Sequence, residues 1–87
     1  MAVKGFNTDL VLNGSKFHVQ SEDWGEDNPL LVTKVFCNGA VVESLKTPYD
    51  VKLYRRNYLN FGDAIQNDLK KQHFRILENL HLKNAEL

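Results

Sequence analysis

Three side chains of this sequence could support nucleophilic or acid–base chemistry: Cys37, His18 and His73. A thiolate paired with an imidazole is a nucleophile. Cys37, however, directly precedes an expected turn at Asn38-Gly39, and an apolar-flanked free cysteine usually behaves as a small hydrophobe. His18 is expected opposite Asp9, where an exposed cross-strand pair explains it. The sequence therefore predicts no enzyme, and we assign no catalytic and no cofactor-binding residue.

A cluster of acids raises the question of a metal site, because hard cations prefer carboxylate oxygens. It comprises Glu22, Asp23, Glu26 and Asp27. Their spacing lacks the alternating acidic pattern and the glycine of a calcium-binding loop. His73 and His81 are too far apart on a helix to share one ion. We expect a solvated acidic loop and no metal.

The charge of the chain limits its partners. Lysine and arginine balance aspartate and glutamate over 87 residues, which argues against a dedicated nucleic-acid binder. Residues 1–50 hold four lysines and seven acids, a net −3, and residues 51–87 hold seven basic residues and four acids, a net +3. The two halves are thus electrostatically complementary. With one cysteine and no apolar run of membrane length, we expect a cytoplasmic protein.

The first half has the alternation of antiparallel strands. Residues 6–12 and 15–22 flank Asn13-Gly14, a strong signal for a type I′ hairpin turn. A two-residue turn places Asp9 opposite His18 and gives the hairpin one apolar and one polar face.

A second hairpin is expected around Asn38-Gly39, from residues 30–37 and 40–47. A regular register gives these pairs: Phe36–Val41, Lys34–Glu43 and Val32–Leu45 on one face, Val35–Val42 and Thr33–Ser44 on the other.

The second half has helical periodicity. Thr47 could cap a helix with Pro48 at its first position, and a break is expected near 60–62 because of Gly62. A long helix is expected from about Asp63 to Leu82. Six residues of the second half fall on one side of a helical wheel and form an apolar stripe: Tyr58, Phe61, Ile65, Leu69, Ile76 and Leu80. Residues 83–87 should fray.

These elements predict a single α+β domain over residues 1–87. A four-stranded antiparallel meander spans residues 6–47, and a helical segment over 48–82 packs on one face of it.

Exposed apolar side chains suggest where a partner could bind. Phe74 should point away from the stripe, and Trp24 lies in the acidic loop. A helix ending at Leu82 could overhang its sheet, leaving Ile76, Leu77 and Leu80 uncovered. We therefore expect a non-enzymatic protein-interaction module that forms a homodimer or docks on another protein, with these five residues at the interface.

The alternative function is nucleic-acid binding. Its residues would be Lys52, Arg55, Arg56, Lys70, Lys71 and Arg75. Basic residues interleaved with aromatics can hold phosphates and stack bases. On a helical wheel, however, these positions scatter around the helix.

The segment Phe17-His18-Val19-Gln20-Ser21-Glu22-Asp23, followed by Val32-Thr33-Lys34-Val35-Phe36, Asn38-Gly39 and Gln72-His73, carries a family resemblance. It resembles a family of small uncharacterised bacterial domains with an F-H-V-Q-T-E-D motif, with Ser21 in place of the threonine. The resemblance implies a bacterial, cytoplasmic protein and transfers no functional residue.

Overall fold

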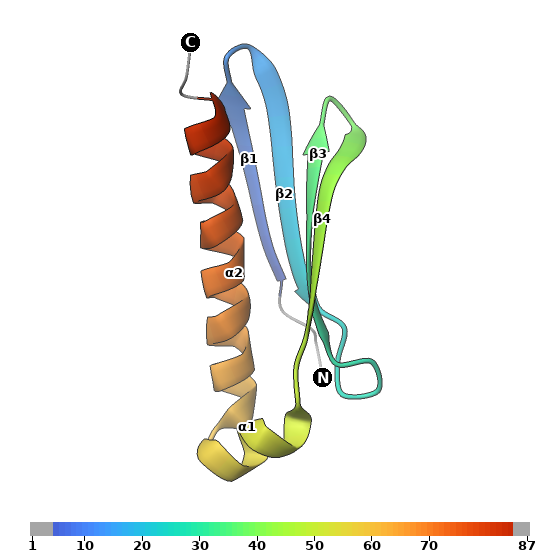
Figure 1. Ribbon diagram of the computed structural model, residues 1–87, viewed down its shortest axis with the longest axis vertical. Coiled ribbons are helices and arrows are strands. Elements are labelled where there is room, and N and C mark those ends of the chain that lie inside the picture. The colour runs from blue at the N-terminus through green and yellow to red at the C-terminus, as the bar shows by residue number, and fades with distance from the viewer. Residues whose placement is uncertain (1–4, 85–87) are drawn as a thin grey trace.

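The computed structural model describes residues 5–84 and confirms the α+β architecture. Four strands form one antiparallel sheet in the order β1-β2-β3-β4, and helix α2 lies along one face of it (Figure 1). The elements are β1 (Gly5–Leu12), β2 (Ser15–Asp23), β3 (Leu30–Cys37), β4 (Ala40–Pro48), α1 (Val51–Asn57) and α2 (Phe61–Asn84).

The first hairpin has the predicted register. Asn13 and Gly14 have φ values of 52° and 81°, the positive pair that a type I′ turn requires. Leu12 faces Ser15 across this turn, and Asp9 faces His18. The even-numbered residues of β1 are half-buried and the odd-numbered ones are exposed, so one face of the strand packs inward.

The register predicted for the second hairpin is wrong beyond its turn. Phe36 faces Val41 as expected, but Val35 then faces Glu43 and Lys34 faces Ser44. Val42 is thus an extra residue, a β-bulge, and each residue of β4 after it is shifted by one. Lys34–Glu43, Val32–Leu45, Val35–Val42 and Thr33–Ser44 are not pairs.

The predicted helix start at Thr47 and Pro48 is also wrong. Both residues belong to β4, where they pair with Leu31 and Leu30. A proline is tolerated there because an edge strand does not need every N–H. The N-cap of α1 is Asp50, whose side chain accepts a 2.9 Å hydrogen bond from the Lys52 backbone N–H.

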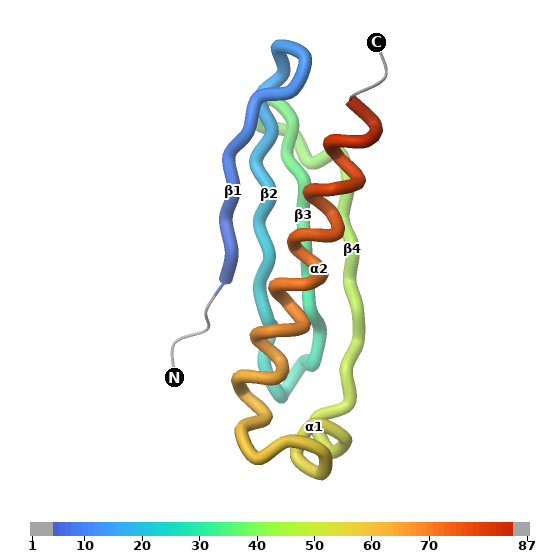
Figure 2. Tube along the Cα trace, turned by 90° about the vertical axis from the view of Figure 1, so that its left-hand side faces the viewer, coloured from blue at the N-terminus to red at the C-terminus, as the bar shows by residue number. Residues whose placement is uncertain are grey.

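Residues 58–60 separate α1 from α2, so the helical segment is broken close to the predicted position. Helix α2 begins two residues earlier and ends two residues later than expected, at Phe61 and Asn84. It crosses the sheet diagonally (Figure 2). The predicted frayed tail is helical as far as Asn84, and its residues 85–87 lie outside the described part of the chain.

The core lies between α2 and the sheet in two apolar clusters. The first contains Val19, Val35, Ile76 and Leu80. The second contains Leu31, Ile65 and Leu69. Between them along α2 lie two buried polar side chains, Gln72 and His73. The sheet therefore covers Ile65, Leu69, Ile76 and Leu80 of the predicted stripe, whereas Tyr58 is 50% exposed.

Candidate protein-binding surface

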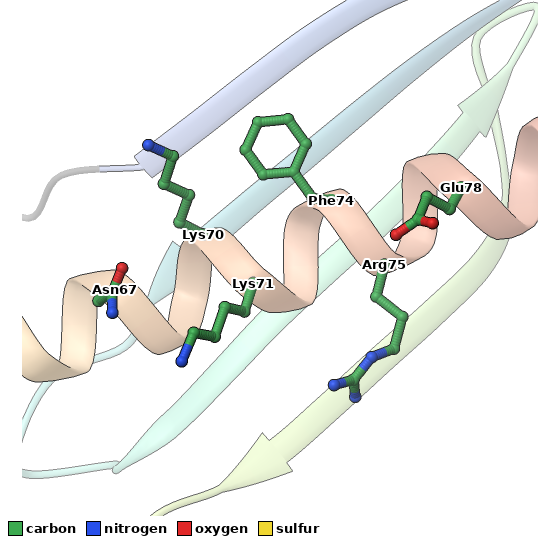
Figure 3. Close-up of a pocket in the computed structure, with 6 residues that line it drawn as sticks. All are labelled: Asn67, Lys70, Lys71, Phe74, Arg75 and Glu78. Atoms are coloured by element: carbon green, nitrogen blue, oxygen red, sulfur yellow. The ribbon is translucent and has the colours of Figure 1, made fainter.

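The outer face of α2 carries a shallow hollow lined by five polar or charged side chains and one aromatic side chain. It is lined by Asn67, Lys70, Lys71, Phe74, Arg75 and Glu78 (Figure 3). Their spacing of three and four residues places them on one side of a helix. Ile65, Leu69 and Ile76 occupy the opposite side and are buried. We call this group of six residues the outer α2 surface.

Phe74 is the apolar centre of the outer α2 surface. Its residue surface is 51% exposed, which agrees with the predicted outward orientation. Lys70 Nζ lies 6.0 Å from the centroid of the Phe74 ring, and the His73 ring meets it edge-on at 6.2 Å. An aromatic ring left half in water retains much of the free energy that its burial against a partner would release.

Three basic residues flank Phe74 on the same surface. Lys70 extends with Phe74 on one side of α2, while Lys71 and Arg75 extend on the other (Figure 3). Lys71 lies 4.0 Å from Asp68, one turn earlier, in an exposed and weak ion pair. Lys70 and Lys71 thus extend in different directions, as the expected scatter of the basic residues requires, and Lys70 is the basic residue placed over the Phe74 ring.

The basic residues of α1 do not line this surface. Arg55 forms an ion pair with Glu26 and lies over the Phe61 ring at 5.2 Å. Lys52 and Arg56 are exposed on the same short helix. The six residues considered for nucleic acid thus divide into two groups, three on each helix.

The predicted overhang of α2 is wrong, because the residues expected in water are covered by the sheet. Ile76 and Leu80 are 5% and 7% exposed and pack against Val19 and Val35. Leu77 is partly buried against the same cluster. Helix α2 has 24 residues and is about 36 Å long, whereas the strands reach about 26–30 Å. Because α2 crosses the sheet diagonally, this excess does not leave Ile76 and Leu80 uncovered (Figure 2).

Trp24 contacts side chains of β2 and β4 and remains 37% exposed. Lys46 Nζ lies 5.0 Å from its ring centroid, and its indole Nε1 lies 3.4 Å from Glu22 Oε1. Glu22, Val32 and Lys46 form one cross-strand row. Trp24 contacts both ends of this row, which explains why Val32 is only 1% exposed on the face without the helix. Trp24 is a weaker candidate for an interface than Phe74.

A buried hydrogen-bond network inside the domain was not predicted from the sequence. Ser21 Oγ lies 2.7 Å from His73 Nδ1, and Thr8 Oγ1 lies 2.9 Å from His73 Nε2. Ser21 Oγ is also 2.6 Å from Thr33 Oγ1, to which Gln72 Nε2 donates at 3.0 Å. The signal in the sequence is Gln72-His73 itself, two polar residues between Leu69 and Ile76 on the inner side of the helix.

This network contains a serine bonded to an imidazole, but it has no access to a substrate. Ser21 and His73 are 1% and 2% exposed. Burial lowers the pKa of His73, and the nearby His18 lowers it further. A neutral imidazole held between two hydroxyls satisfies the polar groups of the core.

The other residues considered for chemistry have structural partners. His18 Nδ1 lies 2.7 Å from Asp9 Oδ1 on the exposed face. Asp23 accepts a 2.6 Å hydrogen bond from the Tyr49 hydroxyl and one from the Gly25 N–H, which fixes the acidic loop. Within residues 5–84, no three side chains of the metal-binding types are grouped closely enough to hold an ion.

Comparisons of the chain with protein-family models, with curated proteins and with solved structures found no match. Neither described helix combines the length and the apolar character needed to cross a membrane.

Proposed function

We propose that this chain is a non-enzymatic protein-interaction module that binds a partner protein through the outer α2 surface. The observation that carries the proposal is Phe74, which is half exposed and shares one surface of α2 with Lys70, Lys71 and Arg75. Aromatic and arginine side chains are enriched where protein interfaces bury most of their free energy. We also propose the cytoplasm as its compartment, which fits a chain with a single cysteine.

The composition of the outer α2 surface defines the partner. Three basic residues against Glu78 give it a net positive charge, so the partner should present carboxylates. Phe74 needs an apolar pocket at the centre of that acidic surface, because an aromatic ring at the solvent-exposed rim of an interface contributes little to affinity. We do not propose a homodimer that forms through Ile76 and Leu80, because both residues are buried within the domain.

An affinity experiment with paired variants tests this function. The tagged wild-type chain, Phe74→Ala and Leu59→Ala are used to capture proteins from the native cell, with identification by mass spectrometry. Leu59 is fully exposed in the α1–α2 connection and is the matched control. We expect a partner that the wild type and Leu59→Ala retain and Phe74→Ala loses. With that partner purified, Phe74→Ala should raise the Kd by at least about tenfold. Equal retention by both variants would contradict the proposal.

Nucleic-acid binding is the second candidate, because Lys70, Lys71 and Arg75 lie beside an exposed aromatic ring. A single strand could place phosphates on the basic groups and stack a base on Phe74. Affinity for a mixed-sequence single strand should then fall steeply with salt, since each neutralised phosphate releases counterions. Nuclease treatment of the captured material separates the two candidates: a protein partner survives it, and a nucleic-acid bridge does not.

A further inference from the structure

The two edges of the sheet differ in how well they are protected against pairing with another strand. Strand β4 contains the bulge at Val42, Lys46 and the terminal Pro48, and these are devices that block edge-to-edge association. Strand β1 runs from Gly5 to Leu12 without a lysine, a proline or a break in its pairing with β2. It forms the other margin of the sheet (Figure 2).

The backbone groups of β1 that point away from the sheet can be identified from the register. Leu12 and Ser15 flank a two-residue turn and therefore exchange backbone hydrogen bonds, and such pairs alternate with non-bonded pairs along an antiparallel ladder. Val11–Lys16 is then a non-bonded pair. The Lys16 carbonyl confirms this, because it accepts a 3.0 Å hydrogen bond from the Asn38 N–H on the opposite side. The N–H and C=O groups at the odd positions 5, 7, 9 and 11 consequently point outward.

The side chains of β1 also leave apolar surface uncovered at this margin. Phe6, Leu10 and Leu12 point toward α2 and pack against the two core clusters, yet each stays only half-buried. A shallow hollow lined by Asp9, Leu10, Val11, Lys16 and Phe17 lies beside the end of the strand. A further strand at this edge would satisfy the backbone groups and extend the apolar face at the same time.

We propose that the strand added at this edge is β1 of a second copy of the chain, in an antiparallel pair centred on Thr8. This joins two four-stranded sheets into one continuous sheet across a two-fold axis. In this register Asn7 faces Asp9 of the second copy and Phe6 faces its Leu10. The apolar residues thus meet on the helix side, and an amide meets a carboxylate on the other side.

The alternative two-fold registers fit less well. Outward backbone groups must meet each other, so the centre can also lie on Asn7, Asp9 or Leu10 if at least five residues of the strand are to pair. A centre on Asp9 places the two Asp9 carboxylates directly opposite each other, which is unfavourable. A centre on Asn7 pairs only residues 5–9 and one on Leu10 only residues 8–12, whereas a centre on Thr8 pairs residues 5–11. The residue types along β1 therefore favour pairing with β1 of a second copy in the register centred on Thr8.

Sedimentation equilibrium tests this dimer, which does not depend on the proposed function of the outer α2 surface. The wild type should show a reversible monomer–dimer equilibrium that is reached at high protein concentration. Asn7→Asp places a second carboxylate opposite Asp9 at both symmetry-related pairs of the dimer. This repulsion should raise the dimer Kd about tenfold. Asn7→Asp combined with Asp9→Asn exchanges the two partners and should restore the wild-type Kd. Asn7 and Asp9 are both exposed, and asparagine at position 9 keeps an oxygen that can accept from His18 Nδ1, so the monomer tolerates these changes.

A variant on the other edge is the control. Val42→Lys lies in the bulge of β4, is exposed and should leave the dimer Kd unchanged. A 10 kDa species alone at millimolar concentration overturns the proposal. A dimer that Asn7→Asp does not weaken, or that the exchanged pair does not restore, overturns it as well.

Discussion

Ser21 Oγ lies 2.7 Å from His73 Nδ1, a hydrogen bond between β2 and α2 that joins residues 52 positions apart. One orientation of the hydroxyls satisfies every link of the network. Gln72 donates to Thr33, Thr33 to Ser21, Ser21 to His73 Nδ1, and His73 Nε2 to Thr8. The imidazole is neutral in this arrangement. The core thus contains a polar layer that fixes how the helix is seated on the sheet.

The stability of the domain should fall as the pH drops below about 6.5, the ordinary pKa of histidine. Burial lowers the pKa of His73 in the folded state, so between the two pKa values the unfolded state binds more protons. His73 can change the free energy of unfolding by at most about 1.4 kcal/mol per pH unit. Urea unfolding between pH 5 and 8 measures it. His73→Gln should remove this slope, whereas the exposed His81→Gln should keep it. Equal slopes for His73→Gln and the wild type would refute this prediction.

Ser21→Ala should cost about 1–3 kcal/mol of unfolding free energy, because it leaves His73 Nδ1 without a donor and the Thr33 hydroxyl without an acceptor. Thr33→Val removes a neighbouring link, so the double variant should cost less than the sum of the single ones. Chemical denaturation of all four forms gives the coupling. Strict additivity would mean that these hydroxyls do not act together.

Deleting Val42 should be tolerated, because Phe36–Val41 and Val35–Glu43 would remain paired once the extra residue is gone. The cost should stay within about 1 kcal/mol, although the edge of β4 becomes flatter and more prone to aggregation. Deletion of the exposed Asn7 in the other edge strand, β1, is the control. The register of β1 has no extra residue that could absorb a deletion, so the residues on one side of the gap turn to the opposite face and the variant should be strongly destabilised. Thermal unfolding by circular dichroism distinguishes them, and equal losses would contradict the assigned bulge.

Gly14→Val and Gly39→Val should each destabilise by about 1–2 kcal/mol, because both glycines have positive φ, 81° and 88°. A Cβ at either position meets no atom within 4 Å, so the cost comes from the backbone alone. Asparagine tolerates positive φ better, so Gly39→Asn should cost less. Melting temperatures test this. A valine variant as stable as its parent would show that the turn has another conformation.

The strand order, the first register and the long helix could be predicted because each depends on neighbours in sequence. The Asn13-Gly14 turn and the alternation around it determine the pairing of Asp9 with His18. The bulge could not be found in this way, because Val41 and Val42 are both apolar and either suits either face. Pro48 was predicted to start a helix, but it ends β4. Its pairing with Leu30 is a tertiary contact, which the residues around Pro48 do not indicate.

The candidate site was predictable only in part. Helical periodicity places Phe74 opposite the stripe, and it is exposed. Whether Ile76 and Leu80 are covered depends on the length of the strands and on the diagonal course of α2 (Figure 2), which the helix sequence does not contain. The hydrogen bonds of Thr8 and Ser21 with His73 could not be predicted either, because they form only when the helix packs on the sheet.

Mapping the binding surface by NMR tests the central claim most directly. Amide chemical shifts of the labelled chain are followed during titration with the purified partner obtained by capture. The largest changes should fall at Lys70, Lys71, Phe74 and Arg75, and Phe74→Ala should greatly reduce them at the same partner concentration. Changes centred on the helix-free face of the sheet or on α1, with the outer α2 surface unaffected, would contradict the account.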